Sequence, residues 1–148
     1  MTPWWKRNKG LAALALLVAL FAIAQFIQPP IPVPPAGYPK AAWEHSSVGP
    51  QVAAILKRSC ADCHSNETRW PWYSRISPGS WLMANHVVRG RRQLNFSRQS
   101  EISEETRGEI HDTIRDGTMP PSSYLVLHGD ARLSPADKKL LMEWALGN

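Results

Sequence analysis

The stretch "VGPQVAAILKRSCADCH", residues 48–64, places the two cysteines of this chain at the end of a predicted helix, with a histidine directly after the second. Its apolar residues are spaced by four, three and one positions, which gathers them on one helical face. These residues are Val48, Val52, Ile55 and Leu56. The predicted helix runs directly into Cys60, so the C-x-x-C-H motif that ends at His64 begins at a helix end.

Four uses of the two cysteines compete. A disulfide between Cys60 and Cys63 would close a very short loop, gain little chain entropy and leave His64 without a role. A thioredoxin-type redox pair follows a strand and opens a helix, whereas a helix precedes this motif. A structural zinc site needs a second pair of ligands at a matching spacing, and the sequence has none.

Covalent haem attachment, the fourth use, gives every residue of the motif a role. Two thiols three positions apart at a helix end can reach the two vinyl groups on one edge of a porphyrin, and the adjacent histidine can ligate the iron. The motif therefore predicts one haem c per chain, bound through Cys60 and Cys63, with its iron ligated by His64.

The ligand on the other side of the iron is open between a methionine and a histidine. Met119 lies in "RDGTMPPSSY", where Gly117 ends a predicted helix and two prolines stiffen the loop around the thioether. A methionine ligand raises the reduction potential relative to a second histidine, which suits an electron carrier. His86, in a helix predicted over residues 78–88, is the alternative. Of the other histidines, His45 is expected near the proline-rich segment, His111 on a solvated helix face and His128 in a loop.

The segment "RWPWYS", residues 69–74, follows the motif and is rich in aromatic side chains. Trp70, Trp72 and Tyr73 offer a large flat apolar surface of the kind that covers a porphyrin edge. We therefore expect these three residues to contact the haem. The alternative is that they complete a small hydrophobic core.

The N-terminal stretch "LAALALLVALFAIAQFI", residues 11–27, has one polar residue in seventeen and follows a basic, tryptophan-containing segment. At about 1.5 Å per residue such a helix just crosses a bilayer core of about 30 Å, with the tryptophans as interfacial anchors. The pattern predicts a transmembrane signal-anchor helix over residues 11–28, with residues 1–10 in the cytoplasm of a bacterium and the remainder in the periplasm. Cleavage near Ala24, which would leave a soluble periplasmic protein, is the alternative.

Residues 29–45 begin with "PPIPVPPAGYPK", which has six prolines in twelve positions. Such a tract takes the extended polyproline form and predicts a stiff stalk. Residues 46–148 then form a single domain. The net charge is +5, but three of the 17 basic residues precede the apolar stretch, which leaves 14 against 12 acidic ones. This near balance argues against nucleic acid as a partner.

The predicted fold class of this domain is all-α, because no segment alternates as a strand would. The predicted helices cover residues 48–60, 78–88, 104–116 and a segment from Ser134, with long loops over residues 63–78 and 119–133. Gly90 and Gly117 are expected to end the second and third helices. Ser134 and Asp137 form a capping box at the start of the last. Loops of this length in a small domain usually line a site.

Two blocks of the sequence resemble the bacterial haem-binding domain family of single-haem, membrane-anchored cytochromes. They are "CADCHSNETRWPWYSRISPGSWLMANHVVRGRRQLNFS", residues 60–97, and "MPPSSYLVLHGDARLSPADKKLLMEWA", residues 119–145. The order of elements over residues 48–146 is also similar to that of a small class I cytochrome c.

The resemblance implies a cytochrome c-like helical domain around one covalently attached haem, held by Cys60 and Cys63 with His64 as ligand. Met119 matches the methionine of the family's MPP block, which implies that it is the sixth ligand. The resemblance also covers His86 and His128, and His86 stays as the alternative ligand.

We therefore expect a membrane-anchored electron carrier, not an enzyme, that passes single electrons at the periplasmic face to redox partner proteins of the membrane or periplasm. One alternative is a haem-based sensor or ligand-binding protein with an open or labile sixth position. Another is a peroxidase-like site, for which His86 is the candidate acid-base residue.

Overall fold

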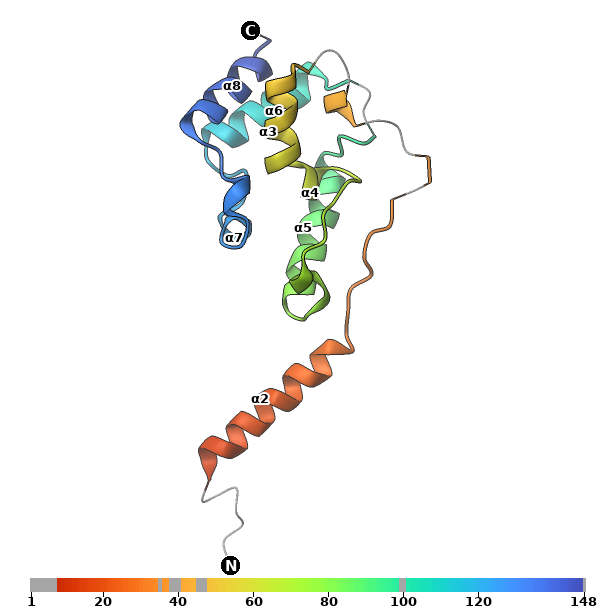
Figure 1. The fold of residues 1–148 in the computed structure, drawn as a ribbon, viewed down its shortest axis with the longest axis vertical. Helices are drawn as coiled ribbons and strands as arrows, with labels where there is room; N and C mark the ends of the chain where they lie inside the picture. Colours follow the sequence, from red (N-terminus) through yellow and green to blue (C-terminus); the bar gives the residue numbers. More distant parts are fainter. Residues whose placement is uncertain (1–7, 35, 38–40, 45–47, 99–100, 148) are drawn as a thin grey trace, which may run out of the picture. The chain divides into compact units, whose positions relative to one another are not determined.

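The computed structural model describes residues 8–34, 36–37, 41–44, 48–98 and 101–147. In these residues the chain forms seven α-helices, three short 3-10 helices and no strand (Figure 1). The predicted all-α class is confirmed. His45 and the tryptophans that precede the apolar stretch lie outside the described residues.

The chain divides into two compact units. The first joins Met1–Pro32 to Trp70–His86, and the second joins Val33–Arg69 to Val87–Asn148. Helix α5 (Gly79–Gln93) begins in the first unit and ends in the second.

The first unit is built on α2 (Lys9–Gln25), the helix of the apolar N-terminal stretch, and on the residues that lead into α5. Gln25 is the polar residue of that stretch. Its Oε1 accepts a hydrogen bond from the Ser77 N–H at 3.0 Å, and its Nε2 donates to the Ser77 carbonyl at 3.3 Å. The Trp81 indole donates to the carbonyl of Ile27 at 2.6 Å. These contacts fix the C-terminal end of α2 to the start of α5.

The prediction that residues 11–28 cross a membrane is wrong. Helix α2 has 17 residues, which at about 1.5 Å each give about 26 Å, whereas a bilayer core is about 30 Å thick. Among the residues that the structure describes, none of the helices combines the length and the apolar character that a membrane crossing requires. The predicted single-pass location, with residues 1–10 in the cytoplasm and an anchored domain in the periplasm, is wrong for the same reason.

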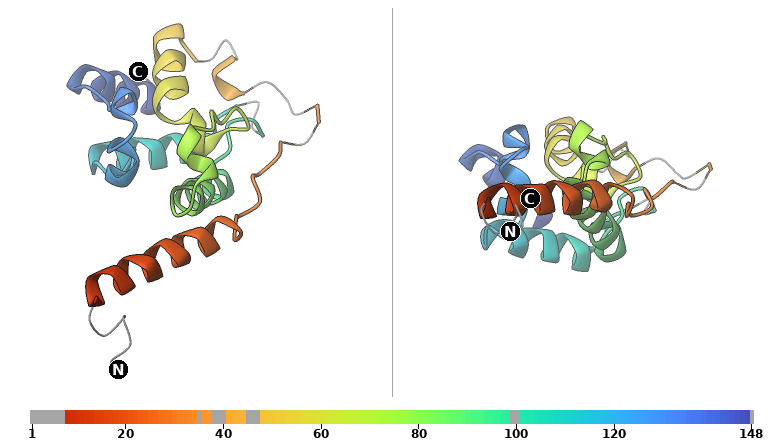
Figure 2. Two further views of the ribbon diagram at one scale, coloured as in Figure 1. Left: turned by 60° about the horizontal axis from the view of Figure 1, so that its bottom comes forward. Right: turned by 90° about the horizontal axis from the view of Figure 1, so that it is seen from below.

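The second unit holds most of the remaining helices. They are η1 (Ala42–Glu44), α3 (Pro50–Ser59), α4 (Ala61–His64), α6 (Glu104–Arg115), α7 (Ser122–Leu125), η3 (Gly129–Ala131) and α8 (Pro135–Ala145). Helix α8 packs against both α6 and α3, and α3 also contacts η1 and η3 (Figure 2). The core between them includes Leu56, Leu141, Trp43 and Phe96.

Two helix ends lie where the capping residues predict them. Gly117, after α6, has a φ of 68°, the left-handed conformation that a glycine cap provides. At the start of α8, Ser134 Oγ accepts from the Asp137 N–H at 3.1 Å and the Asp137 carboxylate accepts from the Ser134 N–H at 2.9 Å. The predicted capping box is thus complete. Asp137 also pairs with Arg58 of α3 at 2.8 Å, which joins the two helices.

Several boundaries differ from the sequence prediction. Helix α5 does not end at Gly90 but continues beyond it. The predicted loop over residues 63–78 contains η2 (Trp72–Arg75), and the loop over residues 119–133 contains α7 and η3. Residues 41–43, which the sequence places in the stalk, are buried in the core. Helical segments of three or four residues are too short to show a periodicity, so their sequence looks like loop.

Replacing Ser134 with Ala is expected to lower the free energy of unfolding by about 1 kcal/mol. The change removes the hydroxyl that accepts from the Asp137 N–H and leaves a helix-terminal donor without its partner. Chemical denaturation of the purified protein measures the difference. Lys139→Ala, in the exposed part of the same helix, is the control and is expected to change stability by less than about 0.5 kcal/mol. Equal losses in both variants would contradict the role of the cap.

Candidate functional site

Cys60 joins two helices of the second unit. Its N–H closes the last turn of α3 by donating to the Leu56 carbonyl at 2.9 Å. Its own carbonyl accepts from the Cys63 N–H at 3.2 Å and from the His64 N–H at 2.9 Å, which forms the single turn of α4. Positions three and four apart on a helix are neighbours. The structure therefore brings the three predicted motif residues together on one turn.

Both cysteines are half-buried free thiols. Burial, and then the neighbouring Cys63, raises the pKa of Cys60 to about 12. Burial, and then the Asp62 carboxylate, raises the pKa of Cys63 to about 11. Both groups are therefore protonated at neutral pH. A thioredoxin-type pair works through a thiol of lowered pKa, so the surroundings of these cysteines do not suit that chemistry.

The imidazole of His64 is oriented by the segment that follows α5. Its Nδ1 lies 3.1 Å from the carbonyl oxygen of Leu94. A carbonyl can only accept, so Nδ1 carries the proton and the lone pair of the neutral ring lies on Nε2. Burial lowers the pKa of His64, against the opposing effect of hydrogen bonds to the carbonyls of Leu94 and Gly90. The ring is therefore neutral at pH 7 and offers Nε2 as a metal ligand.

The segment "LNFS", residues 94–97, forms hydrogen bonds to His64 and to the residues that follow the motif. The Phe96 N–H donates to the His64 carbonyl at 2.8 Å, and the Phe96 ring meets the imidazole edge-on with 6.5 Å between ring centroids. Ser97 Oγ accepts from the Asn66 N–H at 2.9 Å, and both residues are buried. The partners lie about thirty positions apart, so no local pattern predicts this support.

Helix α5 lies very close to the motif at Gly90. A Cβ built at this position would lie 2.5 Å from the carbonyl oxygen of Cys63 and 3.1 Å from its Cβ. Contacts this short exclude any side chain, so glycine is needed for the close approach. Gly90 is thus a packing residue inside the helix, not the helix end that its identity predicts.

Asp62, one of the two unspecified positions of the motif, is buried and ties the residues after the motif back onto it. Its carboxylate accepts from the Arg69 N–H at 2.9 Å and from the Arg69 guanidinium at 3.2 Å. Its carbonyl accepts from the Thr68 hydroxyl at 2.7 Å. The C-x-x-C-H pattern does not assign this residue a role. A charged residue among apolar ones does, however, indicate that its carboxylate is paired or hydrogen-bonded.

Met119 is half-buried and follows α6 in the second unit. The Thr113 carbonyl accepts from the Thr118 N–H at 3.0 Å and from the Met119 N–H at 3.3 Å. The backbone before Met119 is therefore held against the end of α6. Ligation of iron by its thioether remains a prediction.

The aromatic residues and the alternative ligand belong to the first unit: Trp70, Trp72, Tyr73 and His86. Trp72 is 78% exposed and meets Tyr73 edge-on, with 5.8 Å between ring centroids. Such exposure rules out core filling as the role of Trp72. The haem contacts predicted for these aromatic residues, and ligation by His86 instead of Met119, remain predictions.

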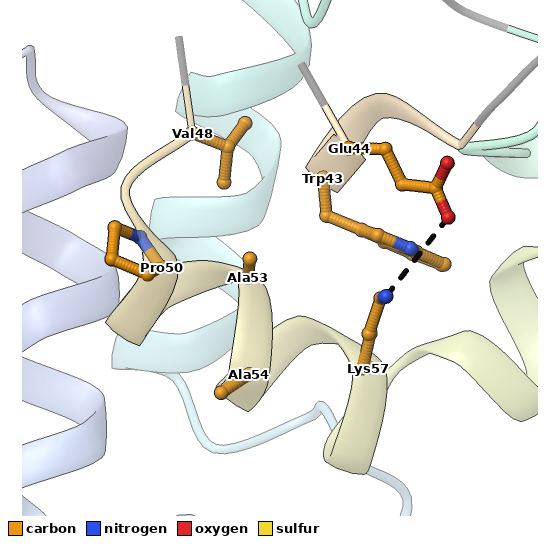
Figure 3. Close-up of a pocket in the computed structure, with 7 residues that line it drawn as sticks. All are labelled: Trp43, Glu44, Val48, Pro50, Ala53, Ala54 and Lys57. Atoms are coloured by element: carbon orange, nitrogen blue, oxygen red, sulfur yellow. Dashed lines mark ion pairs between the residues drawn. The ribbon is translucent and has the colours of Figure 1, made fainter. Parts of the chain in front are cut away.

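A hollow of about 540 Å³ lies beside α3 in the second unit (Figure 3). It is lined by Trp43, Glu44, Val48, Pro50, Ala53, Ala54 and Lys57. Lys57 of α3 and Glu44 of η1 face each other there as an ion pair of 4.0 Å. None of these lining residues is a cysteine, histidine or methionine, so the hollow offers no ligand for iron and is separate from the motif.

The donor set at the motif fits a haem. It consists of two neutral thiols on one helical turn and a neutral imidazole whose Nε2 lone pair is available to iron. A directly bound ion would instead need a cluster of ligands. The described part of the chain contains no group of three or more His, Cys, Asp and Glu side chains placed to hold one.

A comparison with protein families matches residues 19–146 to the model described as "Haem-binding domain". No significant match exists among curated proteins or among solved structures. The family match contains the C-x-x-C-H motif, the "LNFS" segment and Met119, and it confirms the resemblance that the sequence indicates. Because it covers most of the chain, the protein belongs to the haem-binding domain family.

Proposed function

We propose that this protein is a single-haem c-type cytochrome, an electron carrier and not an enzyme, that exchanges single electrons with redox partner proteins. The observation that carries the proposal is the turn from Cys60 to His64, where two protonated thiols lie beside an imidazole oriented by a backbone carbonyl. A haem bound there supplies a ferrous/ferric couple.

The residues of the motif divide the binding of that haem between them. Cys60 and Cys63 would hold it through thioether bonds, which need the thiols to be free, as they are. His64 would bind the iron through Nε2 because Nδ1 is committed to the Leu94 carbonyl. Its lowered pKa favours the unprotonated form that ligation requires.

Met119 is proposed as the sixth ligand. It is the family's methionine by resemblance, and its backbone is held at the end of α6 through the Thr113 carbonyl. Bound to the iron of a haem, the thioether of Met119 would exclude external ligands and raise the reduction potential, both of which suit a carrier.

Absorption spectra of the purified protein, oxidised and reduced, with and without carbon monoxide, test the proposal. We expect a six-coordinate haem c that is indifferent to carbon monoxide. Rapid carbon monoxide binding by the unmodified protein would instead indicate an open site, as in a sensor or a peroxidase. Absence of haem would contradict the proposal altogether.

The sixth ligand is identified by two separate variants. Met119→Ala is expected to abolish the native reduced spectrum and to open the iron to carbon monoxide, because no thioether remains at this position. His86→Ala is expected to leave the spectrum unchanged. The opposite result would assign the sixth position to His86.

A further inference from the structure

Tyr124 of α7 reaches the motif from a distant part of the chain. Its hydroxyl donates a hydrogen bond of 2.9 Å to Oδ2 of Asp62, and both residues are buried. The same carboxylate accepts from Arg69, whose side chain is largely exposed. Tyr124 is therefore the buried donor in this cluster, and it joins α7 to the single turn that carries Cys60, Cys63 and His64.

The position of Tyr124 within α7 is itself closely determined. The Pro121 carbonyl accepts from the Tyr124 N–H at 3.0 Å, so α7 begins directly after the "MPP" segment. The imidazole of His128 stacks on the phenol ring, with 3.8 Å between centroids and 7° between planes. His128 Nδ1 lies 3.1 Å from the Tyr124 carbonyl oxygen. The phenol is thus a rigid part of the short segment that follows Met119.

The loop between α6 and α7, residues 116–121, contains Met119 and is called the Met119 loop. Its two ends are held differently. Upstream, the loop is bonded to α6 through the Thr113 carbonyl. Downstream, it continues into α7 and η3, and η3 packs on α3 with Ala131 buried. A directional contact between the downstream part and the motif turn is the hydrogen bond from the Tyr124 hydroxyl to the Asp62 carboxylate. Burial of Ala131 keeps the downstream part of the loop against α3. The hydrogen bond from Tyr124 to Asp62 fixes where the loop lies along the motif turn.

We propose that Tyr124 is a positioning residue for the sixth ligand. Its hydrogen bond to Asp62 fixes the Met119 loop to the turn that attaches the haem, and so keeps the sixth position of the iron closed. The inference rests on the proposed function, because it requires a haem on the motif with Met119 as its second axial ligand. Tyr124, five positions after Met119, would thereby control the access of external ligands to the iron.

The test uses the full-length, haem-loaded protein and the change Tyr124→Phe, which removes the hydroxyl and keeps the ring. A hydrogen bond to a charged group contributes enough to shift the opening of the loop by about tenfold to a hundredfold. We therefore expect the rate of carbon monoxide binding to the ferrous protein, measured by rapid mixing, to rise by about that factor. The ferric spectrum is expected to show partial loss of the methionine ligand.

Two further variants separate positioning from general destabilisation. Ser134→Ala weakens α8 without touching the loop and is expected to leave the rate of carbon monoxide binding unchanged. Asp62→Asn keeps an oxygen that can accept from Tyr124, so its effect should be smaller than that of Tyr124→Phe. The double variant of Asp62 and Tyr124 should bind carbon monoxide no faster than Tyr124→Phe alone, since both changes affect one bond.

The outcomes distinguish the inference from the function on which it rests. Rapid carbon monoxide binding by the unmodified protein would overturn both. If the unmodified protein binds carbon monoxide slowly, and Tyr124→Phe binds it no faster than the unmodified protein or Ser134→Ala does, the inference alone is overturned. The proposed electron carrier would then stand.

Discussion

The haem of the double variant Cys60→Ser, Cys63→Ser is expected to be released completely into acidified organic solvent, whereas the unmodified protein keeps its haem on the polypeptide. Acid protonates His64 and breaks its bond to iron, but it does not cleave a thioether. Serine is nearly isosteric with cysteine and forms no such bond, so the change removes attachment with little effect on the turn. Extraction followed by absorbance of the two phases measures the result.

The single variants are the matched controls for this experiment. Cys60→Ser and Cys63→Ser should each keep one thioether and hence keep the haem on the chain. Their reduced spectra should shift to longer wavelength, because one vinyl group stays conjugated with the porphyrin. Release of haem from the unmodified protein would show that the haem is not covalently bound and would contradict the c-type assignment, although haem binding itself would stand.

Gly90→Ala is expected to destabilise the protein by about 2 kcal/mol or more and to reduce haem incorporation. The added Cβ would lie 2.5 Å from the carbonyl oxygen of Cys63, and this oxygen belongs to backbone that cannot rotate away. Either α5 or the turn that contains Cys63 must therefore move. The higher helix propensity of alanine, at most about 1 kcal/mol, offsets only part of this cost.

Gly108→Ala is the matched control, since Gly108 is also inside a helix, α6, but a Cβ there meets no atom within 4 Å beyond its chain neighbours and the nearby backbone of its own helix. This change should stabilise the protein by about 0.5–1 kcal/mol through helix propensity alone. Denaturant unfolding and the ratio of haem to protein measure both variants. Stabilisation by both changes would contradict the close approach of α5 to the motif.

Local patterns in the sequence predicted those features that depend on neighbouring residues. The spacing of Val52, Ile55 and Leu56 predicted α3, and these residues are buried in the structure as expected. The Ser134 capping box and the Gly117 cap depend on contacts within a few positions, and both are present. The C-x-x-C-H motif likewise predicted a haem-binding protein, in agreement with the family match.

Hydropathy alone misled the interpretation of the N-terminal stretch. Apolar composition does not fix where a helix ends, and α2 ends at Gln25, where the side chain bonds to the backbone of Ser77 some fifty positions later. The sequence likewise could not tell that Gly90 is a contact glycine rather than a cap, since both uses favour the same residue.

The sequence by itself determined the all-α class, the main helices and the membership of a haem-binding family. Helix periodicity, capping and motif spacing depend on residues that lie close together in the chain. Only the tertiary structure decided how the motif is supported. The Leu94 carbonyl orients His64 across 30 positions, and the Tyr124 hydroxyl reaches Asp62 across 62. Such pairs form only when the whole unit packs together. A local pattern in the sequence does not show which distant residues come into contact.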